Sequence, residues 1–143
     1  MSSAYESATL LIRLYEMRRD ATMREARDWY TRGFNPSSVD EIVQVMSGAH
    51  SGHFRMVTSY WDMAASFVLN GAIDEKMFND ANGEHIVVFA KLEPFVTEYR
   101  GKMGNAGYLA SLEQLVLQRL GATAKEQLAS IRDRFRAMAA AAR

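Results

Sequence analysis

The stretch that decides the fold runs from residue 39 to residue 69 and reads VDEIVQVMSGAHSGHFRMVTSYWDMAASFVL. Its apolar residues return every three or four positions, which is the period of one face of an α-helix. The pattern continues across Gly48 and Gly52, although each glycine costs about 1 kcal/mol inside a helix. We therefore expect one long or gently bent helix, with two separate helices as the alternative. The residues in phase are Val39, Val43, Met46, His50, Phe54, Val57, Trp61, Ala64 and Val68.

The segments on both sides of this stretch also show a helical period. Residues 3–32 change their apolar face halfway, which indicates either one helix with two neighbours or a break near Asp20. The run from Ile86 to Phe89 could form a strand by propensity, but no second strand-like segment exists to pair with it. Residues 86–103 are therefore predicted to be helical, with Pro94 kinking or restarting the helix. The sequence predicts an all-α fold without a sheet: a single helical domain over residues 1–143, built as an antiparallel up-and-down bundle of five or six helices.

Two groups of side chains, the adjacent aromatic pairs and the methionines, could belong either to the core or to a surface that binds a partner. Trp29–Tyr30 and Tyr60–Trp61 are adjacent pairs, and neighbouring residues of a helix point about 100° apart. We expect one ring of each pair in the core and the other at the surface. The chain also contains nine methionines, which suit an adaptable core or a pliable groove.

Composition excludes several classes of protein. The chain is 48% hydrophobic and 24% charged, which argues against disorder. It has no cysteine, so a disulfide scaffold, a thiolate zinc site and a cysteine nucleophile are excluded. Its formal net charge is zero, which argues against a nucleic-acid partner. We find no secretory signal and no apolar run near the roughly 20 residues of a membrane span, so we expect a cytoplasmic protein without a transmembrane segment.

The histidines are the only candidates for a ligand site. His50 and His53 are three residues apart and project from one helical face, while Glu84 and His85 open a later helix. Together they could hold zinc or iron inside a bundle. No His-x-x-x-His pair or Glu-x-x-His motif supports a metal, however, and no nucleophile or phosphate-loop motif is present. We therefore predict no cofactor and expect that the protein is not an enzyme.

The zero net charge conceals a strong asymmetry. Residues 36–99 carry three basic and nine acidic groups, a net of −6, whereas residues 100–143 carry eight basic and three acidic groups, a net of +5. We expect the basic last helix to dock on the chain's own acidic helices. Self-association of its narrow heptad seam is the alternative. The candidate interface residues are Leu128, Ile131, Phe135 and Met138 on the seam, with Arg132 and Arg136 beside it.

Two stretches resemble a known group of proteins. Residues 60–75 read YWDMAASFVLNGAIDE and residues 18–26 read RRDATMREA. They are similar to small uncharacterised bacterial helical domains, in which an aromatic-rich helix ends in a polar-Gly-x-Ile-Asp-Glu turn. Members of that group often carry an N-terminal membrane helix, which this chain lacks. The resemblance implies an all-α bacterial cytoplasmic protein and brings no activity with it.

These observations favour a non-enzymatic protein-interaction or oligomerisation module. We expect a homo-oligomer, with an unidentified protein as a further partner. The alternative is a small-molecule or metal-binding bundle that uses His50, His53 and His85.

Overall fold

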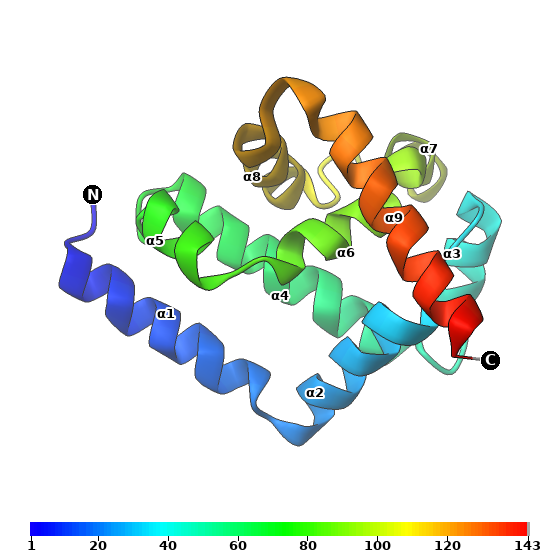
Figure 1. Ribbon diagram of the computed structural model, residues 1–143, viewed down its shortest axis with the longest axis horizontal. Helices are drawn as coiled ribbons and strands as arrows, with labels where there is room; N and C mark the ends of the chain where they lie inside the picture. The colour runs from blue at the N-terminus through cyan, green and yellow to red at the C-terminus, as the bar shows by residue number, and fades with distance from the viewer. Residues whose placement is uncertain (143) are drawn as a thin grey trace.

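The computed structural model describes residues 1–142 and consists of helices joined by short connections (Figure 1). The all-α prediction is confirmed, since no strand occurs within the described residues. The predicted number of five or six helices was wrong, because the chain breaks at points that the hydrophobic period passes through. The α-helices are α1 (Ala4–Arg18), α2 (Ala21–Asp28), α3 (Val39–Met46), α4 (Ser51–Leu69), α5 (Glu75–Ala81), α6 (Glu84–Leu92), α7 (Val96–Met103), α8 (Ala110–Leu120) and α9 (Ala124–Ala141).

The first segment breaks at Asp20, which is one of the two predicted alternatives. α1 begins with a capping box, in which the Ser3 side chain accepts from the Glu6 backbone amide and the Glu6 side chain accepts from Ser3. The Asp20 carboxylate then accepts from the Met23 backbone amide and starts α2. A local cap therefore turns the chain at the position where the apolar face shifts.

Residues 39–69 form two helices, so the favoured single long helix was wrong. α3 ends at Met46, and α4 starts at Ser51 after a turn that contains Gly48. The Ser47 hydroxyl donates to the carbonyl of Val43, which gives the chain an alternative to continuing the helix. The apolar period survives the break, which is why the pattern did not reveal it.

A short 3₁₀ turn, η2 (Glu93–Phe95), separates α6 from α7 and contains Pro94 at its start. Proline lacks the amide hydrogen that a continuing helix needs, so the restart follows from its chemistry. The Ile86–Phe89 run lies inside α6 and is helical, as predicted. A five-residue π-helix, η1 (Trp29–Gly33), extends α2 and was not foreseen.

α4 occupies the centre of the molecule and contacts α2, α3, α5, α6 and α8. In Figure 1 α4 runs across the middle of the picture, whereas α8 lies above it and is seen nearly end-on. The predicted antiparallel up-and-down order of helices stays a prediction. One hydrophobic cluster extends from Leu14 in α1 to Leu128 in α9. Tyr60 and Trp61 are both buried in it, so the expected division of that aromatic pair between core and surface was wrong.

Candidate functional site

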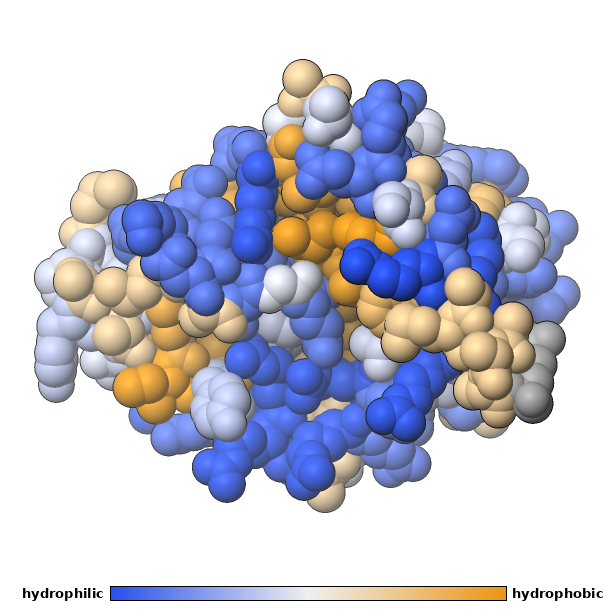
Figure 2. All heavy atoms as spheres, in the orientation of Figure 1, coloured by the Kyte–Doolittle hydropathy of each residue, from blue (hydrophilic) through white to orange (hydrophobic). Residues whose placement is uncertain are grey.

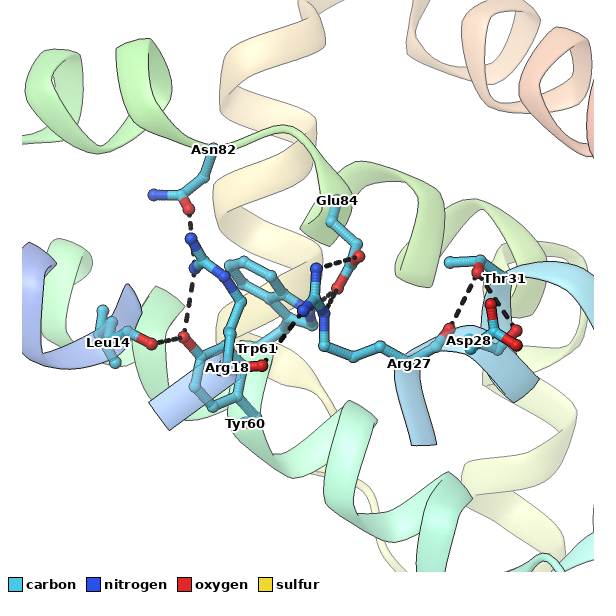
Figure 3. A network of polar contacts seen from close by, with 9 residues as sticks. All are labelled: Leu14, Arg18, Arg27, Asp28, Thr31, Tyr60, Trp61, Asn82 and Glu84. Atoms are coloured by element: carbon cyan, nitrogen blue, oxygen red, sulfur yellow. Dashed lines mark hydrogen bonds and ion pairs between the residues drawn. The ribbon is translucent and has the colours of Figure 1, made fainter. Parts of the chain in front are cut away.

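Glu84, a predicted ligand, is the centre of a polar network between α2, α4 and α6 (Figure 3). Its carboxylate accepts from Arg27 Nε at 2.9 Å, from Arg27 Nη2 at 3.0 Å and from Trp61 Nε1 at 3.0 Å. The hydrogen bond to Glu84 raises the pKa of the Arg27 guanidinium. Both carboxylate oxygens therefore serve to join helices, and the geometry gives Glu84 a structural role.

Arg18 joins a second part of the same network. Its Nη1 donates to the Tyr60 hydroxyl at 3.2 Å and to Asn82 Oδ1 at 3.0 Å. The Tyr60 hydroxyl in turn donates to the Leu14 carbonyl at 2.6 Å (Figure 3). The guanidinium also lies 5.2 Å from the centre of the Trp61 ring. The C-terminal half of α1 is thus fixed to α4 from one side.

His85 is fully buried beside the same network. Its ring lies 5.0 Å from the Phe78 ring and 5.8 Å from the Trp61 ring, measured between centroids. Neither ring nitrogen has a hydrogen-bond partner among the described residues. Burial, with a smaller contribution from the Arg119 charge, lowers the pKa of His85 to about 4. His85 is therefore a neutral imidazole at physiological pH.

His50 and His53 lie elsewhere, at the start of α4. The exposed His50 ring stacks on Trp29 at a centroid distance of 4.8 Å, and the His53 ring lies 5.8 Å from it. His85 packs on Trp61, which is eight residues after His53 and therefore about 12 Å further along α4. Residues 1–142 contain no group of three side chains able to hold a metal ion. The structure does not bring the three predicted histidines together.

The candidate interface residues of α9 mostly face the chain's own core. Leu128 is buried and Ile131 packs against the core cluster. Phe135 covers the Lys91 ammonium at 5.0 Å, and Arg136 donates to the Pro36 carbonyl at 2.9 Å. Of these seam residues, Met138 is the one that is largely exposed.

The electrostatic prediction for α9 is confirmed at one position. Arg132 Nη1 lies 3.5 Å from the Glu93 carboxylate and donates to the Ala90 carbonyl at 2.8 Å. α9 therefore docks on α6 and on the turn that follows it, both of which belong to the acidic middle of the chain. Arg143, the last basic residue of the sequence, lies outside the described residues.

Lys91 is an important residue that sequence reasoning missed. Its ammonium group is buried and donates to the carbonyls of Tyr30, Thr31 and Phe34 at 2.7–2.9 Å. Burial lowers the pKa of Lys91 to about 8, so the cation still prevails at pH 7. It satisfies carbonyls at the end of the π-helix, where backbone acceptors lack partners. The one available signal was a lysine inside the apolar run of α6.

α1 exposes an apolar stripe on its outer surface. Tyr5 is 82% exposed, Ile12 59% and Tyr15 54%, and Ala8 lies between them on the same face. Strongly hydrophobic side chains reach the surface along α1, at the lower left of the space-filling view (Figure 2). We call Tyr5, Ala8, Ile12 and Tyr15 the α1 stripe. Large contiguous apolar patches on a protein surface are typical of interaction sites.

A methionine-lined groove of about 610 Å³ lies between the α1–α2 corner and α4. Four of the nine methionines line it, and its one charged lining side chain is Asp20. Its other lining residues are the exposed Ser59 and the buried Tyr60. A methionine-lined groove, one of the two uses that the methionine content allowed, is present at a place the sequence did not indicate. We call it the methionine groove; its methionines are Met17, Met23, Met56 and Met63.

The family model for a domain of unknown function, DUF4760, matches residues 3–119. The chain belongs to the DUF4760 family. The match confirms the resemblance to an uncharacterised domain family. It ends inside α8, so α9 follows the matched region. No curated protein and no solved structure matches the chain. No helix within the described residues has the length and apolar character needed to cross a membrane.

Proposed function

We propose that this DUF4760 protein is a non-enzymatic helical module that binds other protein chains and assembles into oligomers. The observation that carries the proposal is the methionine groove, an apolar concavity on the surface. Methionine side chains are flexible and polarisable, so they adapt to partners of different shape. The sequence resemblance and the absence of cysteine support a bacterial cytoplasmic setting for this role.

The groove suits an apolar helix. Met56, Ser59 and Met63 follow one another at intervals of three and four residues along α4, so they form one continuous wall about 10 Å long. An amphipathic helix would place two turns of apolar side chains against that wall. Asp20 adds one negative charge, which favours a partner helix with a basic residue at the edge of its apolar face.

The remaining polar groups support a binding role over catalysis. Glu84 is engaged by Arg27 and Trp61, and Lys91 is engaged by three backbone carbonyls. A catalytic acid, base or nucleophile has to reach its substrate. These side chains instead hold helices together.

The groove can be tested with a fluorescent synthetic helix made of leucine on one face and arginine on the other. We expect saturable binding to the wild-type protein, measured by fluorescence anisotropy. Ser59→Arg should abolish the binding, because Ser59 is exposed and the longer side chain would fill the groove. Ser130→Arg, at an exposed serine of α9, is the matched control and should bind normally. Unchanged binding by Ser59→Arg would refute the proposed function.

A further inference from the structure

We propose that the helix received by the methionine groove is α1 of a second copy of the chain, so that copies associate head to tail. This inference rests on the proposed function and specifies the partner. It is carried by two apolar surfaces that are exposed in the described part of the chain: the α1 stripe and the methionine groove.

The stripe has the spacing that a helical groove accepts. Tyr5, Ala8, Ile12 and Tyr15 follow one another at intervals of three, four and three residues, so they form one straight apolar seam on a two-turn or longer helix. The buried Leu14, whose carbonyl accepts from the Tyr60 hydroxyl, holds α1 by another side, and the Arg18 guanidinium lies 5.6 Å from the centre of the Tyr15 ring at the end of the seam. The seam is therefore presented on a fixed helix, which lowers the entropic cost of docking it.

The charges of the two surfaces complement each other. The groove's one charged lining residue is Asp20, whose Oδ2 accepts from the Met23 backbone amide and which makes no ion pair within residues 1–142. Arg19 follows Tyr15 by four residues and continues the face of the stripe. The Arg19 side chain is exposed and likewise makes no ion pair in the described part of the chain. A stripe docked in the groove can thus bring Arg19 of one copy to Asp20 of the other.

The two surfaces lie on different sides of α1. Met17, which lines the groove, follows Ile12 by five residues, and this places it about 140° around α1 from Ile12. In a twofold dimer, therefore, the two grooves cannot both be filled by the stripe of the other copy. The contact is heterologous, and each added copy leaves one stripe and one groove open.

The size of the contact indicates weak association. α1 has 15 residues and is about 22 Å long, so it presents less than the roughly 800 Å² per partner of a standard stable interface. We expect self-association that depends on concentration, with dissociation constants near or above about 1 μM.

The test is sedimentation velocity on the full chain across a concentration series. The wild-type mass should rise beyond that of a dimer. Ile12→Glu, which removes the stripe, and Ser59→Arg, which fills the groove, should each associate at least tenfold more weakly. Met103→Glu, at an exposed methionine of α7, and Ser130→Arg are the matched controls and should behave as wild type. Circular dichroism establishes that each variant is folded.

Mixing the two deficient variants decides the geometry. Ile12→Glu keeps its groove and Ser59→Arg keeps its stripe, so the mixture should form a species of two chains and grow no further. A mixture that stays monomeric, or a Ser59→Arg variant that dimerises alone through its stripes, would overturn the proposal. A wild-type chain that stays monomeric yet binds the leucine–arginine helix also overturns it, together with the oligomerisation part of the proposed function, but leaves the helix-binding part intact. Failure of both experiments refutes both.

Discussion

Acid should destabilise this protein through His85, and the magnitude follows from its burial. The folded pKa of His85 is about 4, against an ordinary value of 6.5. Between these values the unfolded chain binds more protons than the folded chain, so stability falls as the pH falls. The contribution of the neutral His85 to the free energy of unfolding is fully present above pH 6.5. It is smaller by about 2 kcal/mol at pH 5 and by about 3 kcal/mol at pH 4.

The perturbation that isolates this effect is His85→Leu. Leucine does not titrate, and it replaces two ring nitrogens that have no hydrogen-bond partner within the described residues. The assay is urea unfolding, followed by circular dichroism, at several pH values from 8 down to 5. We expect the wild type to lose about 2 kcal/mol more than His85→Leu over that range. His50→Gln, at an exposed histidine, is the control and should retain the wild-type dependence.

One result would refute this reasoning: parallel pH profiles for the wild type and His85→Leu. Such profiles would mean that the imidazole finds a partner or water in both protonation states. Carboxylates also titrate toward the low end of the range, but they are the same in both proteins, so the difference between the two profiles reports His85 alone.

Three further substitutions test the contacts that build the domain. Glu84→Gln should lower the free energy of unfolding by about 1 to 2 kcal/mol, because the partly exposed ion pair with Arg27 loses its negative charge. Urea unfolding measures this change. An unchanged free energy would contradict the conclusion that Glu84 holds the helices together. Lys91→Met should lower the free energy of unfolding by about 2 to 4 kcal/mol and speed amide hydrogen exchange in η1, since three backbone carbonyls lose their hydrogen-bond donor. Lys125→Met, at an exposed lysine of α9, is the control. Leu128→Ala should lower the free energy of unfolding by about 3 kcal/mol, because Leu128 is buried in the core. If α9 belongs to a single domain, the whole chain should still unfold in one cooperative transition. A main transition that does not change would show that α9 unfolds separately.

Much of the fold could be predicted because helical period and caps are local properties of the sequence. Asp20 caps the start of α2 with its carboxylate, and Pro94 interrupts the helix because it lacks an amide hydrogen. Both breaks lie where the sequence predicts them. The turn around Gly48 was missed, since the apolar residues on its two sides stay in phase. Periodicity reports which residues face the core, but it does not report whether the backbone between them is continuous.

The tertiary roles of polar residues were harder to predict. The charge asymmetry indicated that α9 would meet the acidic middle, and the ion pair of Arg132 with Glu93 confirms this at one position. The predicted ligands failed to converge because His50 and His85 lie near different positions along α4. The methionine groove joins Met17 to Met63, and only the tertiary fold brings them together. A sequence pattern within one helix could not have placed them there.

Nuclear magnetic resonance of isotope-labelled methionine methyl groups tests the central claim most directly, because it reports at once on the methionine groove and on exposed methionines of other helices. As the protein concentration rises, we expect the signals of Met17, Met56 and Met63 to shift together. Those of Met103 and Met138, exposed elsewhere, should stay in place. Shifts confined to Met138 would assign the contact to α9, and unchanged groove signals would contradict the claim that the methionine groove receives a second copy.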